Sequence, residues 1–300
     1  MRGVSLGDHL LSNRFAAAIR EKYPNEKITL YSDTEGNGAS SKLLMKFFPS
    51  FYDSAKVIGV RKNQDFQIYT KFGKETYPSH IDNLPDDTLE EIKTSDIFYD
   101  LHIDSLKWIK SDFDWLRYYY FFPKVQINLD KQKYTDDGYI LCHLYSRPNS
   151  PYNLEQWYVH QLLKNISPLR KVVVITQQEH KDFYKDIESE NILVVTPNLE
   201  ECFSLAQDCS LFLGIDSGIR YIPYHFSKPV FVFSKYCSEY GNVAESHLIR
   251  WLIFRQNVFP MHFNFKSVEN IVKNSLENKL YHLFPQIQGK IDEYVVDRNL

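Results

Sequence analysis

The second half of the chain alternates short apolar runs with amphipathic segments. The apolar runs are rich in β-branched and aromatic residues and have the length of buried strands, at residues 139–145, 171–176, 192–196, 211–215 and 230–233. The segments between them have the length and polarity of helices, at residues 154–164, 179–187, 199–207 and directly after Asp216. Strands that alternate with helices form βαβ units, whose right-handed crossovers build a parallel sheet covered on both faces. The pattern therefore predicts a doubly wound, Rossmann-like α/β domain.

The first half shows the same alternation less regularly. A helix is predicted over residues 8–22, and it ends before Pro24 because the residue preceding a proline disfavours the helical conformation. The remaining predictions are strands at 28–31, 57–60, 66–69 and 97–103, a helix at 41–48 and a polar loop at 78–87. This pattern predicts a second Rossmann-like domain, whose first strand is short or missing because only residues 1–4 precede the first turn.

A charged segment separates the two predicted domains. Residues 131–138 contain no apolar side chain except Tyr134, so we expect an N-terminal domain at 1–130, a linker at 131–138 and a C-terminal domain at 139–300. An amphipathic helix is predicted at 267–281, and packing of this C-terminal helix on the first domain is one arrangement to test. Two doubly wound domains in tandem predict a ligand cleft between the carboxyl ends of their sheets.

Composition narrows the class of protein. The chain is 43% hydrophobic and 24% charged, which is ordinary for a globular protein and argues against disorder. A net charge of -3 does not favour a general nucleic-acid binder, although a local site for one phosphorylated small molecule remains compatible with it. No signal peptide or apolar run of membrane-spanning length is present, so we expect a cytoplasmic protein. Aromatic residues at 115–122 suit peripheral contact with the inner face of the membrane, although a core or cleft lining explains them more simply.

Little in the sequence supports a metal site. Asp112 and Asp114 form a DxD pattern, but this pattern is common by chance and no further ligand pattern follows it. The ten histidines include no HxxxH or HExxH pair. The cysteines show no metal-binding spacing, and we expect them to be reduced thiols: Cys142, Cys202, Cys209 and Cys237.

The first candidate site is the turn Gly7-Asp8 at the start of the first predicted helix. The Asp8 carboxylate could cap this helix by accepting backbone N–H bonds, or it could accept a proton from an attacking hydroxyl. Position alone favours capping.

The second candidate is Asp216-Ser217-Gly218, where a predicted strand ends and a helix begins. Free N–H groups at a helix N-terminus, the Ser217 hydroxyl and the unhindered Gly218 together suit a phosphate. Asp216 would repel a phosphate, so we expect it to hold the loop by accepting N–H bonds. A plain capped helix is the alternative.

The third candidate is the loop after residues 139–145. The planar fork of Arg147 could bind a phosphate. Further along the loop, Asn153 and Gln156 have the spacing of a helix capping box.

Taken in order, these segments resemble the heptosyltransferase-like glycosyltransferases of family 9. SLGDHLL at residues 5–11 resembles the family's opening Leu-Gly-Asp turn, and IFYDLHID at 97–104 resembles its Tyr-Asp-Leu strand. Residues 143–157 resemble a histidine-containing strand end, a basic loop and a helix carrying a tryptophan. The stretch LEECFSLAQDCSLFLGIDSGIRYIPYHFSKPVFVF at 199–233 resembles the family's second signature, in which an Asp-Ser/Thr-Gly turn starts a helix and a Pro-Val strand follows. The resemblance covers most of the chain. It implies the GT-B fold and a metal-independent transfer of sugar from a nucleotide donor.

The resemblance also implies roles for individual residues. Asp8 becomes the expected general base, and Arg147, Asp216, Ser217 and Gly218 the expected donor-phosphate site. The expected cleft-lining residues are Gly7, His143, Ser146 and Tyr221.

Two departures from the family bear on the donor. The family's lysine before the tryptophan helix aligns with Ser150, and its histidine after the Asp-Ser/Thr-Gly turn aligns with Tyr221. Pro223 is expected to shorten or kink the helix after that turn. A nucleotide sugar other than ADP-heptose is therefore an open alternative.

The resulting prediction is an inverting glycosyltransferase of polysaccharide biosynthesis that needs no cofactor or metal. Its expected partners are a nucleotide-sugar donor and a glycan or lipid-linked acceptor, and no nucleic acid. A GT-B epimerase or hydrolase of nucleotide sugars is one alternative, and a non-catalytic nucleotide-sugar-binding protein is another.

Overall fold

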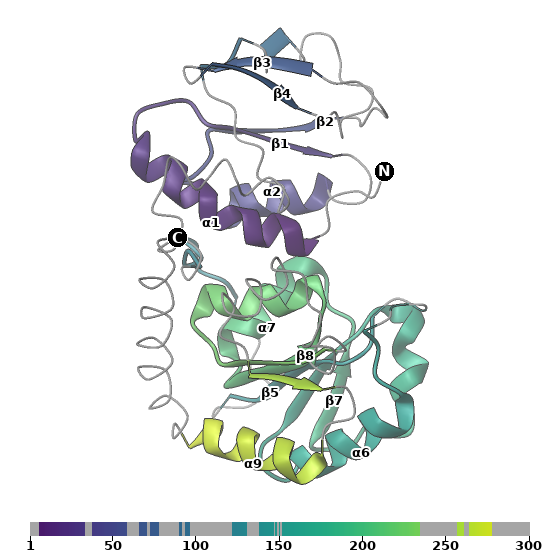
Figure 1. Ribbon diagram of the computed structural model, residues 1–300. Helices are drawn as coiled ribbons and strands as arrows, with labels where there is room; N and C mark the ends of the chain where they lie inside the picture. Colours follow the sequence, from purple (N-terminus) through teal and green to yellow (C-terminus); the bar gives the residue numbers. More distant parts are fainter. Residues whose placement is uncertain are drawn as a thin grey trace, which may run out of the picture. The chain divides into compact units, whose positions relative to one another are not determined.

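The fold is described from a computed structural model of the chain. The structure describes residues 6–33, 38–58, 66–70, 73–77, 90–91, 94–96, 122–130, 138–146, 148, 150, 152–234, 257–260 and 264–277. The chain divides into two compact units, Met1–Asn128 and Leu129–Leu300, which we call the N-terminal and C-terminal units (Figure 1).

The C-terminal unit is built on one parallel sheet. Its strands are β5 (Ile140–His143), β6 (Val172–Ile175), β7 (Ile192–Val195), β8 (Leu211–Ile215), β9 (Val230–Ser234) and β10 (Asn257–Pro260). They lie in the order β10-β9-β8-β5-β6-β7, and every neighbouring pair is parallel. Counted within this unit the order is 6-5-4-1-2-3, which is the doubly wound arrangement predicted from the sequence. The order of strands reverses between β5 and β8.

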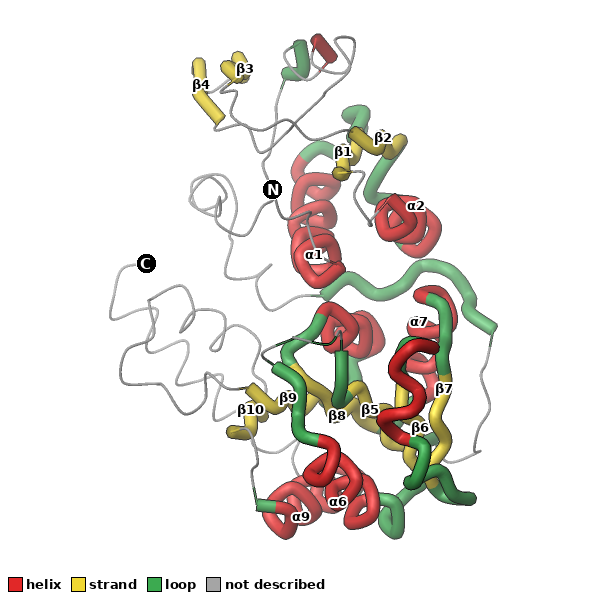
Figure 2. The backbone as a smooth tube through the Cα atoms, turned by 90° about the vertical axis from the view of Figure 1, so that its right-hand side faces the viewer, coloured by secondary structure: helices red, strands yellow, loops and turns green. Residues whose placement is uncertain are grey.

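Helices cover both faces of this sheet. The C-terminal unit contains the α-helices α6 (Gln156–Ile166), α7 (Leu199–Asp208) and α9 (Phe265–Leu276), and the 3-10 helices η2 (Gln178–Tyr184) and η3 (Gly218–Phe226). Figure 2 shows α6 and α9 on one side of the sheet and α7 on the other. Helix η2 packs against α6, and η3 packs against α7. Crossovers on both faces of the sheet follow from the reversal of strand order between β5 and β8.

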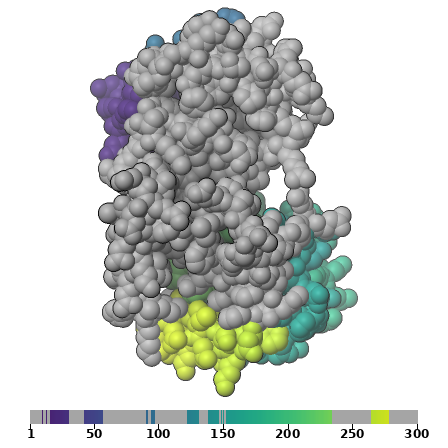
Figure 3. Space-filling view, in the orientation of Figure 1, coloured from purple at the N-terminus to yellow at the C-terminus, as the bar shows by residue number. Residues whose placement is uncertain are grey.

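One large hydrophobic cluster of this unit lies on the face covered by α6 and α9. Alternate strand residues point to the same face, and those of β5, β6 and β8 join a single buried cluster with Tyr158 of α6, Tyr184 of η2 and Val268 and Val272 of α9. The space-filling view shows α9, in yellow, beside the teal residues of the same unit (Figure 3). Helix α9, the described part of the helix predicted at 267–281, therefore buries Val268 and Val272 within the C-terminal unit.

Local sequence signals fix the ends of α7. Asn198 is its N-cap, and its side chain accepts a hydrogen bond from the backbone N–H of Glu201 at 2.9 Å. The Glu201 carboxylate in turn accepts from the backbone N–H of Asn198 at 2.7 Å. This capping box satisfies two N–H groups that have no partner inside the helix. On the same face of the sheet, the hydroxyl of Tyr139 donates to the carbonyl of Leu205 at 2.8 Å and ties the helix to the chain entering β5.

The described part of the N-terminal unit begins with an alternation of helices and strands. It consists of α1 (Leu6–Lys22), β1 (Thr29–Asp33), α2 (Gly38–Phe47) and β2 (Ser54–Ile58), followed by β3 (Phe66–Thr70) and β4 (Gly73–Tyr77). Strands β1 and β2 are parallel, and β3 and β4 form an antiparallel pair. The parallel β1-α2-β2 unit agrees with the predicted α/β class.

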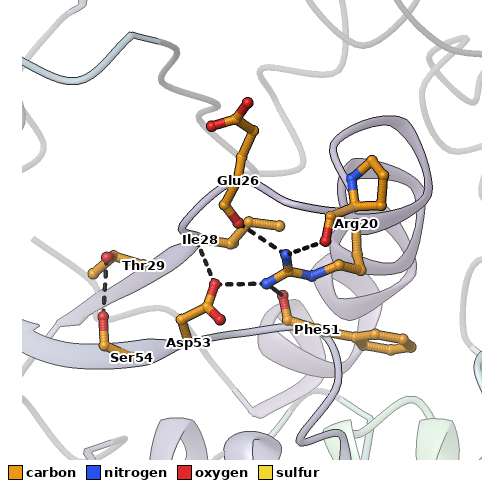
Figure 4. A network of polar contacts seen from close by, with 8 residues as sticks. Arg20, Glu26, Ile28, Thr29, Phe51, Asp53 and Ser54 are labelled. Atoms are coloured by element: carbon orange, nitrogen blue, oxygen red, sulfur yellow. Dashed lines mark hydrogen bonds and ion pairs between the residues drawn. The ribbon is translucent and has the colours of Figure 1, made fainter.

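One arginine joins three segments of the N-terminal unit (Figure 4). Arg20, near the end of α1, donates through Nη1 to the carbonyl oxygens of Pro24 and Glu26, at 3.2 and 2.9 Å. Its Nη2 donates to the carbonyl of Phe51 at 3.4 Å and to Oδ2 of Asp53 at 2.6 Å. The planar guanidinium thereby binds the loop before β1 and the loop before β2 at once, which a single ammonium group could not do with the same geometry.

The Asp53 carboxylate completes this network. Its Oδ2 also accepts from the backbone N–H of Ile28 at 2.7 Å. The hydrogen bond from Ile28, followed by that from Arg20, lowers the pKa of Asp53 below its ordinary value. Both donors favour the ionised carboxylate.

Most predicted elements of the described residues are confirmed, with shifted ends. The helix predicted at 179–187 is the 3-10 helix η2, which ends at Tyr184, and the helix predicted after Asp216 is the 3-10 helix η3, which contains Pro223. Pro223 lacks the N–H that a continuous α-helix would use. Strands β4 and β10 were not predicted. The strand expected at 97–103 and the loop expected at 78–87 lie outside the described residues.

Candidate functional site at the reversal of strand order

The candidate site lies at the carboxyl ends of β5 and β8. In doubly wound sheets, ligands bind where the strand order reverses, and here the reversal falls between these two strands. His143 is the last residue of β5 and is directly paired with Gly214 of β8. Its Nδ1 lies 2.9 Å from Oγ of Ser217, two residues beyond β8. The structure therefore brings together two residues that are 74 positions apart in the sequence.

Burial keeps the imidazole of His143 uncharged. The residue is only 7% exposed, and desolvation lowers its pKa to about 4. At neutral pH the ring therefore carries one N–H and one acceptor nitrogen. A neutral ring of this kind can hold a neighbouring hydroxyl in place without adding charge to the site.

Gly214 of β8 lies in a crowded position beside the backbone of His143. A Cβ at Gly214 would lie 3.0 Å from the carbonyl oxygen of His143 and 2.5 Å from the ring of Phe212. Both distances are shorter than ordinary contacts. A side chain at this position would therefore push on the ring of Phe212 and on the backbone of β5.

Ser217 occupies the N-cap position of η3, but its side chain does not cap that helix. Its hydroxyl contacts His143 instead. Helical hydrogen bonding begins with the N–H of Arg220, which donates to the carbonyl of Ser217 at 3.3 Å. The N–H groups of Gly218 and Ile219 precede that first bond, as at any helix N-terminus. Oriented N–H groups beside a hydroxyl suit an anion.

Asp216 is held by an arginine. Its Oδ1 accepts from Nη1 of Arg220 at 2.9 Å, four residues along the chain. The sequence predicts that Asp216 accepts backbone N–H bonds, whereas in the structure its carboxylate binds this guanidinium. The ion pair joins residues on either side of Ser217 and so holds the loop.

Arg220 belongs to this site but was not predicted from the sequence. It is 8% exposed, donates to the hydroxyl of Tyr221 and lies 4.6 Å from the centre of that ring. Burial opposes its charge, but nearby Tyr221 and Asp216 outweigh burial and hold the pKa of Arg220 above its ordinary value. Tyr221, which we expected to line a cleft, is itself buried and contacts this guanidinium. The i,i+4 spacing of Asp216 and Arg220 was the available signal.

The loop after β5 is closed by a side chain. The backbone N–H of Ser146 donates to Oδ1 of Asn153 at 2.8 Å. The predicted capping role of Asn153 is therefore wrong: α6 begins at Gln156, its N-cap is Glu155, and no side-chain cap bond is made there. Asn153 is engaged in closing the loop and is too far back to cap the helix.

For three predicted site residues the structure describes the backbone at most. Gly7 and Asp8 lie in the first turn of α1, which begins at Leu6, but only their backbone is described. Arg147 lies outside the described residues altogether. Their predicted roles stay predictions.

The part of the chain that the structure describes offers no cluster of three or more histidine, cysteine, aspartate or glutamate side chains arranged for a metal ion. The DxD pattern at Asp112 and Asp114 and the aromatic segment 115–121 lie outside it. Cys142, Cys202 and Cys209 are buried and form no disulfide. Within the same residues, no helix has the length and apolarity needed to cross a membrane.

Comparison with known proteins defines the class of fold. No family model and no curated protein matches the sequence. Solved structures do match: the glycosyl transferase family 9 protein of Veillonella parvula DSM 2008 has a TM-score of 0.54 at 13% identity, over 89% of this chain and 86% of that one. The ADP-heptose LPS heptosyltransferase II of E. coli also has a TM-score of 0.54, at 9% identity, over 92% of this chain and 98% of that one.

The chain therefore has an α/β fold of the GT-B class. Its resemblance to the heptosyltransferase-like glycosyltransferases, first seen in short sequence motifs, is confirmed at the level of fold. At these identities the likeness concerns the fold, and the chemistry has to be argued from the site.

Proposed function

We propose that this protein is a glycosyltransferase that moves a sugar from a nucleotide-sugar donor to a hydroxyl of a glycan or lipid-linked acceptor. The observation that carries the proposal is the contact of 2.9 Å between His143 and Ser217 at the reversal of strand order. Because of this contact, the Ser217 hydroxyl does not cap its own helix, although it lies beside the N–H groups at the start of η3. A nucleoside diphosphate supplies the anion that such a site suits.

In this proposal the C-terminal unit binds the donor. The N–H groups at Gly218 and Ile219 and the hydroxyl of Ser217 stabilise the negative charge that develops on the leaving diphosphate. Preorganised dipoles are effective at this task because they need no reorganisation during the reaction. Arg147 is proposed as a further cation at the diphosphate. No metal is required by this scheme.

Asp8 is the proposed general base. Its carboxylate accepts the proton of the acceptor hydroxyl as the oxygen attacks the anomeric carbon, the glycosidic bond to the diphosphate breaks, and the electron pair leaves with the diphosphate. Attack from the opposite side inverts the anomeric centre. The proton ends on Asp8 and is then released to water. A positioned base of this kind typically accelerates transfer by about 10²–10⁴-fold.

The first experiment is a thermal-shift screen with ADP, UDP, GDP, CDP and dTDP, each with and without EDTA. A ligand that binds only the folded protein raises the melting temperature by mass action. A shift with one diphosphate that EDTA leaves unchanged supports the proposal and names the base. The absence of any shift refutes donor binding and favours a protein with another role.

The second experiment separates transfer from other turnover of the donor. The nucleotide sugars of the base so identified are incubated with and without acceptor glycans, and Asp8→Asn is compared with the wild type. We expect Asp8→Asn to bind the diphosphate normally and to lose at least about 100-fold in transfer rate. Near-normal transfer by folded Asp8→Asn would remove Asp8 as the base. Donor consumption without an acceptor would indicate an epimerase or hydrolase instead.

A further inference from the structure

The hydroxyl of Ser217 makes a contact unlike that of an ordinary N-cap serine. An N-cap serine usually accepts a hydrogen bond from an N–H in the first turn of its helix. Ser217 has the extended backbone of an N-cap, with φ -136° and ψ 164°, but makes no such bond. Its Oγ is engaged with Nδ1 of His143, which belongs to the neighbouring strand. The direction of that hydrogen bond decides what the hydroxyl can still do.

Two directions are available to this bond. A hydroxyl has one proton, and a neutral imidazole carries one proton on either nitrogen. If Ser217 donates to Nδ1, its only proton is used and it can offer a ligand nothing but lone pairs. If Nδ1–H donates to Oγ, the hydroxyl proton remains available to an oxygen of an anion. An anionic ligand at this site therefore favours the second direction.

We propose that His143 is a positioning residue that carries its proton on Nδ1, donates to Oγ of Ser217 and thereby directs the Ser217 hydroxyl proton toward the phosphate of the bound nucleotide. This inference rests on the proposed function, because it presumes a nucleotide diphosphate at the start of η3. His143 acts through Ser217 and does not itself contact the donor.

Three features of the site hold this arrangement. The pairing of His143 with Gly214 fixes the backbone of His143 relative to β8, and the chain continues from β8 to Ser217. The ion pair of Asp216 with Arg220 fixes the loop from the other side. Burial of the ring to 7% exposure keeps water from replacing Ser217 as the partner of Nδ1. A ring held in this way can select one hydroxyl orientation.

The test is a cycle of variants measured by calorimetric titration with the diphosphate that gives the largest thermal shift. His143→Phe removes the donor, and Ser217→Ala removes the hydroxyl. We expect each to weaken binding about tenfold or more, as for the loss of one hydrogen bond to a charged group, and the double variant to lose little beyond either single one. His143→Asn, whose amide can donate from nearly the same position as Nδ1, should recover most of the affinity.

A matched control checks that the effect is local. His160 is a half-buried histidine on α6, bonded to the carbonyl of Phe183 at 2.9 Å. His160→Phe should leave the affinity within about twofold of the wild type, since it lies on the opposite face of the sheet. Wild-type affinity in folded His143→Phe, or losses that multiply in the double variant, would overturn the positioning role while leaving the proposed function intact. Failure of the wild type to bind any diphosphate would instead remove the proposed function, and this inference with it.

A spectroscopic measurement tests the proton directly. Histidine ring nitrogens labelled with ¹⁵N distinguish the two neutral tautomers by chemical shift. We expect the Nδ1–H form for His143 in the complex with the diphosphate. The Nε2–H form in that complex would overturn the inference, whatever the affinities show.

Discussion

Replacement of Arg220 by methionine should destabilise the C-terminal unit strongly. The guanidinium is 8% exposed and donates both to Asp216 and to the hydroxyl of Tyr221. Methionine has a similar unbranched stem, so the change removes the charge and the donors while most of the apolar packing stays. Breaking a buried ion pair by removing one partner costs about 3–5 kcal/mol because the other charge is left uncompensated.

The structure argues for a value below that range. The Asp216 side chain is 29% exposed, so water can solvate part of the carboxylate that Arg220→Met leaves behind. We therefore expect a loss of about 2–3 kcal/mol in the free energy of unfolding. For a unit of this size, such a loss lowers the melting temperature by roughly 4–12 °C.

The assay is urea and thermal unfolding of the wild type, Arg220→Met, Asp216→Asn and the double variant. The two singles should be non-additive, with a coupling energy of about 1–3 kcal/mol, since each leaves the other member of the same ion pair uncompensated. Arg220→Lys is the matched control, and it should fall between Arg220→Met and the wild type because an ammonium keeps the charge but not the planar fork. A melting temperature of Arg220→Met within about 1 °C of the wild type would refute the reasoning.

Three further changes test other parts of the fold. Asp53→Asn should lower the free energy of unfolding by about 1 kcal/mol at pH 7, a modest value because the side chain is 49% exposed. Because the folded protein lowers the pKa of Asp53, the stability difference between the wild type and Asp53→Asn is present above pH 4 and shrinks as acid protonates the carboxylate, which acid titrations of the stability of both proteins would reveal. Asn198→Ala should lose about 1 kcal/mol through the capping box of α7, while Asn198→Asp keeps most of it; equal urea midpoints for the alanine variant and the wild type would contradict the cap. Gly214→Ala should cost about 1–3 kcal/mol by pushing on the ring of Phe212, and an unchanged melting temperature would show that the ring moves freely.

The sequence predicts the C-terminal unit well because burial on both faces of a parallel sheet demands continuous apolar runs. Residues 171–176 and 211–215 are such runs, and they contain β6 and β8. Strand β10 was missed because Asn257–Pro260 is short and ends in a proline, which reads as a loop, although proline is tolerated on the outer strand of a sheet.

The candidate site was predicted in its pieces but not in its pairings. His143 and Ser217 were both named, yet their contact depends on β8 lying next to β5, and strand order cannot be read from local pattern. Asn153 had the spacing of a helix cap, but its side-chain oxygen accepts a hydrogen bond from the backbone N–H of Ser146 instead. Arg220 was not singled out, because local pattern does not show that this residue of η3 is buried.

The pairing of β5 with β8 has a consequence for the protein during its synthesis. Strand β5 is central in the finished sheet, but one of its two neighbours, β8, begins at Leu211, long after β5 ends at His143. At roughly 5–20 residues per second, the ribosome needs about 3–14 seconds to make the intervening chain. Throughout that interval the backbone edge of β5 that later pairs with β8 has no partner strand. During its synthesis the nascent chain therefore passes through a stage at which the backbone N–H and C=O groups of that edge are open to pairing with another chain.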